Sequence, residues 1–197
     1  MEEPTPFQRL TWPARTERLL LRPLRADDVP AVFEIRRQPE VARWMSALPD
    51  DYEEFVQAFS DPARTDTMLV MLHDGALVGD LYLAVSDAWG QREVAAGTKR
   101  TQAEIGWCVD PAYAGRGLAS EGAAELLRLC FDGLGLRRAT AGAFAANAAS
   151  IRVMEKIGMT IEGRGRQDSL HRELGWVDGV TAAVLADEWR TAAEESR

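Results

Sequence analysis

The sequence predicts an α/β (α+β) fold in a single domain, on three observations. The 197 residues allow one full-sized domain but hardly two, because domains usually span about 100 to 200 residues. Short β-rich runs alternate along the chain with segments of helical periodicity. Hydrophobic residues make up 46% and charged residues 27% of the chain, close to the average of globular proteins, which disfavours disorder, collagen and coiled coil.

The first part of the chain predicts an arm, a strand and a helix. Residues 1–16 carry three prolines and are expected to form an extended arm. Residues 17–24 (ERLLLRPL) predict a strand. A helix is expected over residues 27–37, because Asp27 and Asp28 precede it and carboxylates favour the positive end of a helix dipole.

A second helix and a hairpin are expected next. The helix begins after Pro49–Asp51 and ends near Ser60, since apolar residues recur there at a spacing of three or four. Residues 67–85 predict a β-hairpin, because Asp74–Gly75 is a strong turn signal. Residues 86–100 are polar and lack periodicity, so they predict a long loop, either one that carries function or a bare solvated connection.

The second half of the chain is more regular. It predicts, in order, a strand, a glycine-rich loop, a helix, a strand, a helix and two final strands, over residues 103–110, 111–117, 118–132, 136–144, 147–158, 159–167 and 176–189. Asn147 suits the start of its helix, and Gly158 suits the end.

Charge and cysteine content exclude several classes of function. Asp and Glu number 31 against 23 Lys and Arg, a formal charge of −8, so a nucleic-acid partner is not expected. Cys108 and Cys130 have neither metal-site spacing nor the density of a disulfide scaffold, so two buried thiols in a reducing compartment are expected. The chain shows no signal-peptide pattern and no apolar run of 18 residues, which predicts a cytoplasmic protein without a membrane partner.

The unit that points to chemistry is a strand, the loop Tyr113–Ala119 and a helix. Glycines allow a backbone to approach a ligand closely, and the helix dipole adds a positive end, so this turn is suited to a phosphate or pyrophosphate. A tight connection without a ligand has the same pattern. A Walker loop is excluded because no Lys-Ser or Lys-Thr pair occurs. The position of the loop after several strands argues against a dinucleotide-binding fold.

Two segments in order carry a resemblance: AEIGWCVDPAYAGRGLASEG, and about thirty residues later NAASIRVMEKIGM. They resemble the GNAT superfamily of acyl-CoA-dependent N-acyltransferases, and in particular its branch of ribosomal-protein N-terminal acetyltransferases. Gly117 and Ala119 fit the end of the family's pyrophosphate motif, whereas Ala114 stands where the motif usually has Arg or Gln. That departure, shared with the branch, leaves pyrophosphate binding to backbone amides.

The resemblance covers residues 17–190 and leaves 1–16 as an arm and 191–197 as a tail. It implies a mixed, twisted sheet of six or seven strands, splayed between strands four and five, with helices on both faces. Acetyl-CoA is then expected in the splay as co-substrate, without a metal.

The resemblance also implies a set of site residues. Glu104 would accept the amine proton, and Ser150 would assist the leaving thiolate. The substrate residues would be Trp44, Met45 and Glu104, and the cofactor residues would be Trp107, Cys108, Val109, Ala114, Gly115, Arg116, Gly117, Leu118, Ala119, Asn147 and Ser150. Each has a structural alternative: Glu104 and Arg116 as solvated charges, Asn147 as a helix N-cap, Trp44 and Trp107 as packing residues.

The function that the resemblance implies is transfer of an acetyl group from acetyl-CoA to a primary amine, by direct attack in a ternary complex. The acceptor is a protein N-terminus or a small amine, and a homodimer is expected from the branch. The alternative is an acyl-CoA-binding sensor or regulatory module without turnover, because Met154 stands where many family members have a tyrosine.

Overall fold

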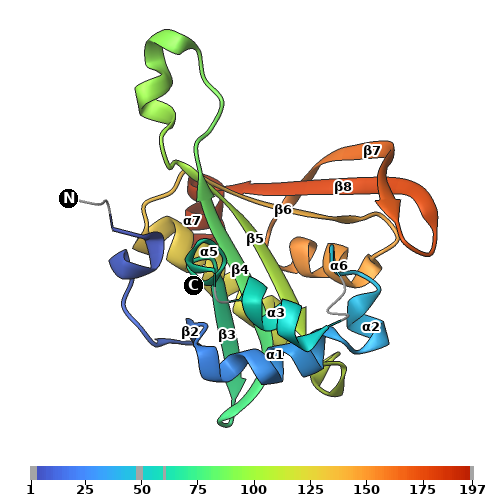
Figure 1. Cartoon of the computed structure of the whole chain (residues 1–197). Coiled ribbons are helices and arrows are strands. Elements are labelled where there is room, and N and C mark those ends of the chain that lie inside the picture. Colours follow the sequence, from blue (N-terminus) through green and yellow to red (C-terminus); the bar gives the residue numbers. More distant parts are fainter. Residues whose placement is uncertain (1–3, 48–50, 60, 196–197) are drawn as a thin grey trace. The chain divides into compact units, whose positions relative to one another are not determined.

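A computed structural model describes residues 4–47, 51–59 and 61–195 of the chain (Figure 1). Its α-helices are α1 (Val29–Arg36), α2 (Pro39–Ala42), α3 (Tyr52–Ala58), α4 (Pro62–Thr65), α5 (Leu118–Arg128), α6 (Ala148–Lys156) and α7 (Ala186–Glu195). The strands are β1 (Ala14–Arg15), β2 (Leu19–Pro23), β3 (Met68–His73), β4 (Ala76–Ser86), β5 (Gln102–Val109), β6 (Arg138–Phe144), β7 (Thr160–His171) and β8 (Gly175–Leu185).

The strands form a mixed sheet with the hydrogen-bonded order β1-β2-β3-β4-β5-β6-β8-β7. The family resemblance implies six or seven strands, and the described residues form eight, because two residues of the expected arm, Ala14 and Arg15, pair with β2. Counted from β2, the fourth and fifth strands are β5 and β6. Their parallel ladder joins Gln102–Glu104 to Arg138–Thr140, at the start of both strands.

The chain divides into two compact units, and strands β4 and β5 and helix α5 contribute residues to both. The first unit comprises residues 1–83 and 106–125. In it, helices α1 and α3 cover one face of the antiparallel strands β2, β3 and β4 (Figure 1), with Phe33, Phe55 and Val70 in one core cluster. Helix α5 packs on the other face, with Gly122 so close to Met71 that a Cβ would lie 2.5 Å from its sulfur.

The second unit comprises residues 84–105 and 126–197. Strand β8 lies between β6 and β7 and is antiparallel to both. Helix α6 buries Met154 completely, and α7 packs Trp189 against Phe131 with ring centroids 5.6 Å apart. The sequence predicts a final strand as far as Trp189, but β8 ends at Leu185, where α7 begins.

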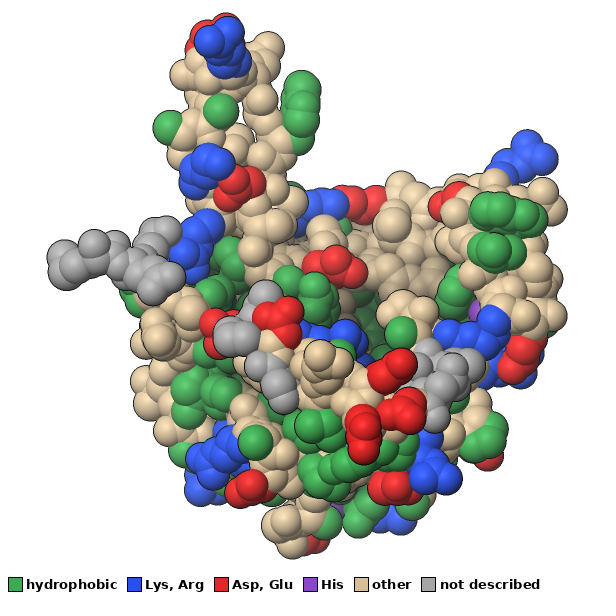
Figure 2. All heavy atoms as spheres, viewed as in Figure 1, with side chains coloured by type: hydrophobic (Ala, Val, Ile, Leu, Met, Phe, Trp, Pro, Cys, Tyr) green, Lys and Arg blue, Asp and Glu red, His purple; other side chains and the backbone are tan. Residues whose placement is uncertain are grey.

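The segment between β4 and β5 stands away from the strands that it joins (Figure 1). A loop is expected over residues 86–100, and the structure contains a 3-10 helix, η3 (Arg92–Thr98), within it. Lys99 pairs with Asp87 at 2.5 Å and closes the segment on itself. Its surface carries hydrophobic side chains (Figure 2), including Trp89, which is 92% exposed.

Most local predictions agree with the structure. The hairpin turns at Asp74 and Gly75, both with positive φ, as the Asp-Gly signal predicts. Asp51 caps α3 by accepting bonds from the amides of Glu53 and Glu54, whereas Pro49, Asp50 and Ser60 lie outside the described residues. The expected arm is not fully extended, because residues 6–9 form a 3-10 turn that buries Phe7. Among the described residues, no helix is long and apolar enough to cross a membrane.

Candidate active site

The glycine-rich loop joins β5 to α5 within the first unit. Asp110 follows β5 and accepts a hydrogen bond from the Ala112 amide at 3.0 Å. Gly115 and Gly117 have φ of +74° and +80°, the left-handed region that glycine adopts without a steric penalty. A Cβ at Gly115 would meet no atom within 4 Å, so the backbone there is open to a ligand. Because α5 begins at Leu118, its first amides and its dipole favour a bound anion at this loop.

The side chains of the loop contribute little to such an anion. Arg116 folds back on the loop: its guanidinium lies 5.0 Å from the Tyr113 ring centroid and donates to the Ala112 carbonyl oxygen at 3.2 Å. Leu118 is buried, and it can therefore offer an anion only its backbone amide. The predicted cofactor residues Ala114 to Ala119 are thus brought together as a backbone surface.

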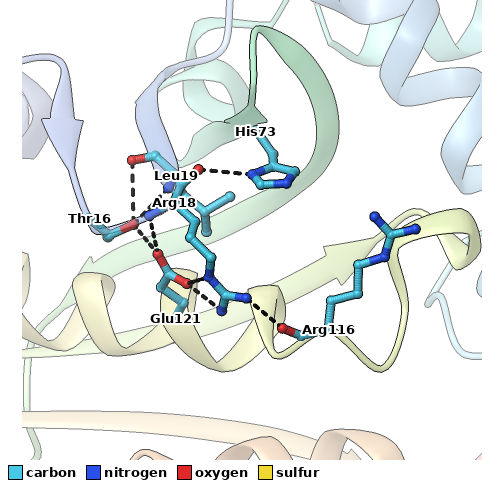
Figure 3. Close-up of polar contacts among 6 residues, drawn as sticks. All are labelled: Thr16, Arg18, Leu19, His73, Arg116 and Glu121. Carbon is cyan, nitrogen blue, oxygen red and sulfur yellow. Dashed lines mark hydrogen bonds and ion pairs between the residues drawn. The ribbon is translucent and has the colours of Figure 1, made fainter.

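A clamp of Thr16, Arg18 and Glu121 holds this loop to the start of β2 (Figure 3). Arg18 donates from Nε to Glu121 Oε2 at 2.7 Å and from Nη1 to the Arg116 carbonyl oxygen at 2.8 Å. Thr16 Oγ1 donates to Glu121 Oε1 at 2.5 Å, and the Arg18 amide donates to the same oxygen at 2.8 Å. His73 Nδ1 lies 3.1 Å from the Arg18 carbonyl oxygen. One arginine therefore joins the loop backbone to the first turn of α5.

The sequence does not predict this clamp, because Arg18 and Glu121 are separated by about a hundred residues and no local pattern links them. Glu121 is ionised in it. Burial opposes ionisation, but the hydrogen bonds from Thr16 and Arg18 outweigh burial and hold the pKa of Glu121 below its usual value.

Strand β5 carries the predicted base and the predicted polarising amides. Glu104 is exposed and lies opposite Thr140 in the ladder with β6. The buried positions of the strand are Ala103, Ile105 and then Cys108, so the two-residue alternation shifts between Ile105 and Cys108. The regular pairing with β6 covers only Gln102–Glu104, at the start of the strand. Trp107 and Val109 flank Cys108 beyond this pairing and are half-buried.

Both cysteines are buried and protonated. Burial, and then the carboxylate of Asp80, raise the pKa of Cys108 far above its ordinary value. Burial raises the pKa of Cys130 to about 12. Since the thiolate is the nucleophilic form, neither cysteine is poised to form a covalent acyl-enzyme.

Helix α6 of the second unit holds the predicted residues Asn147 and Ser150 at its start. The Asn147 side chain accepts a hydrogen bond from the Ser150 amide at 3.1 Å, which confirms the N-cap alternative for this residue. Ser150 is half-buried. Met154, one turn later, is completely buried and belongs to the core. Among the described residues, no hydrogen bond joins Ser150 to Glu104.

The predicted acceptor residues follow α2 in the first unit. Trp44 is half-buried, with the Arg43 guanidinium 5.0 Å from its ring. Met45 packs against a cluster that contains Ile35 and Cys108. The structure thus brings Met45 to the strand segment whose amides are predicted to polarise a thioester.

The histidines have structural contacts. His171 is buried at the end of β7, and its Nδ1 accepts bonds from the amides of Glu173 and Leu174. Within the ranges that the structure describes, no group of three His, Cys, Asp or Glu residues could hold a metal ion.

The sequence of the chain is similar to the sequences of known acetyltransferases. The family described as acetyltransferase (GNAT) domain matches residues 18–160. The N-acetyltransferase YnaD of Bacillus subtilis, described as uncharacterized, is 29% identical over 180 residues, which cover 88% of this chain and 97% of that protein. The L-amino acid N-acetyltransferase AaaT of Escherichia coli is 29% identical over 152 residues, 77% of this chain and 89% of that protein.

Solved structures agree with the fold. An acetyltransferase (GNAT family) from Bacillus anthracis superposes with a TM-score of 0.73 at 28% identity, covering 88% of this chain and 98% of that one. RimJ of Mycobacterium smegmatis, in complex with CoA-disulfide, has a TM-score of 0.68 at 24% identity and 89% coverage of both chains. The second likeness concerns the fold alone.

Proposed function

The chain belongs to the acetyltransferase (GNAT) family and is an acyltransferase; from this premise we propose that it transfers the acetyl group of acetyl-CoA to a primary amine in a ternary complex. The observation that carries this proposal is the loop before α5. Its two left-handed glycines and the open backbone at Gly115 suit a pyrophosphate held by amides, and no lysine is needed.

We assign the cofactor contacts as follows. The amides of residues 114–119 bind the pyrophosphate, and Arg116 reaches a phosphate oxygen by leaving its contact with Ala112. The backbone of residues 107–109 pairs with the pantetheine arm, and Asn147 contacts the same arm beside its capping bond to Ser150. The clamp of Thr16, Arg18 and Glu121 keeps the loop in its binding conformation.

The chemistry needs a neutral amine, a stabilised oxyanion and a leaving thiolate. Acetyl-CoA supplies the acyl group as a thioester. Glu104 accepts a proton from the amine, directly or through water, while the amine nitrogen forms its bond to the carbonyl carbon. Amides between Trp107 and Val109 stabilise the charge on the carbonyl oxygen. The carbon–sulfur bond then breaks, and Ser150 donates a hydrogen bond to the thiolate, which takes its proton from water.

A direct attack is favoured because the cysteines offer no thiolate. Burial holds both thiols protonated. A covalent acyl-enzyme would need a nucleophile activated by a neighbouring base.

Trp44 and Met45 are proposed to line the acceptor side, since Met45 packs on Cys108. The acceptor is a small amine or a protein N-terminus. The names of the relatives cover both classes: one is an L-amino acid N-acetyltransferase and another a putative ribosomal N-acetyltransferase. A homodimer and a cytoplasmic location remain predictions.

The alternative function is an acyl-CoA-binding module without turnover. Its supporting observation is Met154, which stands where many family members have a tyrosine. This methionine is completely buried and cannot act as an acid. The two functions differ in one respect: only the enzyme releases CoA thiol when an amine is added.

The test is a thiol-release assay with acetyl-CoA and a panel of primary amines. Glu104→Gln is expected to lower kcat by about 100-fold or more, the usual contribution of a general base. The matched control is Glu34→Gln, an exposed carboxylate on α1, which should retain full activity. Full activity of Glu104→Gln at every pH would refute the assignment of the base, and no thiol release with any amine would favour the binding module.

A further inference from the structure

Strands β4 and β5 approach each other closely at Gly79, in the first unit. A Cβ at this position would overlap the carbonyl oxygen of Cys108 and would lie 3.1 Å from the Cα of Val109. Both atoms belong to the backbone of β5, so neither can move aside as the end of a flexible side chain can. The approach of the two strands at this point therefore requires glycine.

The same contact fixes the direction of the peptide between Cys108 and Val109. Its oxygen is the atom nearest to the Cβ position of Gly79, so the carbonyl points toward β4. Because a peptide is planar and trans, the N–H of Val109 points in the opposite direction, away from β4. The next amide agrees with this direction, because Asp110 donates to the Val78 carbonyl oxygen in β4 at 2.9 Å and successive amides of an extended strand alternate.

The Val109 amide lies outside the parallel ladder of β5. Within the described chain, that ladder joins Gln102–Glu104 to Arg138–Thr140 and ends well before Val109. Val109 is half-buried, so its amide is partly withdrawn from water. A backbone donor in such a place needs an acceptor, and a carbonyl oxygen of a ligand can supply one.

The side chain of Cys108 is held by a buried ion pair on the opposite face of β4, since neighbouring side chains of a strand point to opposite faces. Arg36 of α1 donates from Nε to Asp80 Oδ2 at 3.0 Å and from Nη2 to Asp80 Oδ1 at 2.5 Å, and both side chains are less than 10% exposed. Burial raises the pKa of the Cys108 thiol, and the Asp80 carboxylate raises it further through its charge and as a hydrogen-bond acceptor. Cys108 is thus held by its thiol at Asp80 and by its carbonyl at Gly79.

We propose that Gly79 is a positioning residue of the acetyl transfer: it lets the Cys108 carbonyl turn toward β4, so that the Val109 amide donates to the carbonyl oxygen of the thioester. This inference rests on the proposed function and names, among the amides between Trp107 and Val109, the donor and the residue that directs it. Donors that are already oriented toward the developing oxyanion stabilise the transition state. A Cβ at residue 79 would displace the Cys108 oxygen, rotate the planar peptide and turn the Val109 amide away from the thioester.

The test is isotope-edited infrared spectroscopy of acetyl-CoA labelled at its carbonyl carbon. A hydrogen bond to the carbonyl oxygen weakens the carbon–oxygen bond, so bound acetyl-CoA should absorb at a lower frequency than free acetyl-CoA. Gly79→Ala should reduce this shift and, at saturating acetyl-CoA, lower kcat by about 100-fold, the effect of misplacing a catalytic group by about 1 Å. A loss of stability alone would not change the frequency in the folded complex.

The matched control is Gly122→Ala, which crowds the same methionine without touching β5. A Cβ would lie 2.8 Å from Met71 Cε at Gly79 and 2.5 Å from the Met71 sulfur at Gly122, where the other nearest atoms belong to the side chain of Leu81. This variant should keep the infrared shift of the wild-type protein. A wild-type shift in Gly79→Ala, or an equal reduction in Gly122→Ala, would overturn the inference while acetyl transfer itself stood.

Amide hydrogen exchange in the wild-type protein tests the geometry without a substitution and without turnover. In the ligand-free protein the Val109 amide should exchange faster than the Asp110 amide, which is bonded to Val78. Acetyl-CoA should protect the Val109 amide more than CoA does, because only acetyl-CoA carries the acetyl carbonyl. Such protection would support the donor even if no amine were acetylated. Equal exchange of the two amides without ligand, or equal protection by CoA and acetyl-CoA, would overturn the inference even if Gly79→Ala failed to fold.

Discussion

At the scale of single residues, the pair of Arg36 and Asp80 shows how a buried charge constrains the first unit. Removing water from two charges costs free energy that their mutual attraction barely offsets. Removing one partner is far worse, because the other charge then remains buried without compensation. The pair joins α1 to β4, and its net contribution to stability is small compared with the cost of removing one partner alone.

Asp80→Leu is predicted to lower the free energy of unfolding by about 3 to 5 kcal/mol, because it leaves Arg36 buried and unpaired. The double variant Arg36→Met with Asp80→Leu should recover most of the loss. Urea unfolding measures both, with Asp187→Asn in the exposed pair with Arg190 as a near-neutral control. A double variant as unstable as the single one would contradict this account of the pair.

The Glu121 carboxylate predicts a pH dependence with a definite sign. Its pKa is lower in the folded chain than the ordinary 4.5, so its bonds to Thr16 and Arg18 stabilise the fold fully above pH 4.5. That contribution is lost as the pH falls through the lowered pKa.

Glu121→Gln should therefore cost about 1 to 3 kcal/mol of unfolding free energy near neutral pH. The difference from the wild-type protein should shrink as the pH is lowered below 4.5. Chemical unfolding at a series of pH values measures it. A difference that stays constant or grows toward pH 3 would mean that Glu121 is not the ionised partner of Arg18.

At the scale of elements, the loop before α5 depends on the left-handed backbone of Gly115 and Gly117. An alanine in this conformation costs about 1 to 2 kcal/mol. Gly158, after α6, has a φ of +82° and open space at its Cβ position, so Gly158→Ala carries the same strain elsewhere in the chain.

Gly115→Ala and Gly117→Ala are predicted to destabilise the protein as much as Gly158→Ala does, but to weaken acetyl-CoA binding by a further factor of about 10, the loss of one good charged hydrogen bond. Calorimetric titration with acetyl-CoA measures the difference. Equal affinities in all three variants would show that the loop backbone does not hold the cofactor.

The elements also show which parts of the fold local sequence determines. The Asp74–Gly75 turn, the Asn147 cap and the start of α5 each depend on residues within one turn, and the sequence predicts all three. Helices α2 and α4 have four residues each and are missed, because such short helices depend on packing more than on propensity.

Local sequence likewise predicts one part of the candidate site and not the other. The loop 114–119 follows from its glycines and from the family resemblance, whereas the clamp of Thr16, Arg18 and Glu121 joins residues distant in sequence. An arginine in a sequence gives no sign of whether it meets a carboxylate or a ring. The roles of Glu104 and Ser150 stay predictions, because exposure and capping are compatible with both function and structure.

At the scale of the whole molecule, the net charge of −8 does not describe the electrostatic potential at each binding site. The phosphate loop lies at the positive end of helix α5. The anionic phosphates of a cofactor can thus bind to a protein of net negative charge.

The central claim, that this molecule binds acetyl-CoA through its CoA portion, is tested most directly by thermal unfolding with acetyl-CoA, CoA or ATP. A ligand at 100 times its dissociation constant stabilises a protein by about 2.7 kcal/mol, which raises Tm by roughly 5 to 10 °C for a chain of this size. We predict such a rise with acetyl-CoA and with CoA but not with ATP. No rise with either CoA species would contradict the loop assignment and the catalytic roles that depend on it.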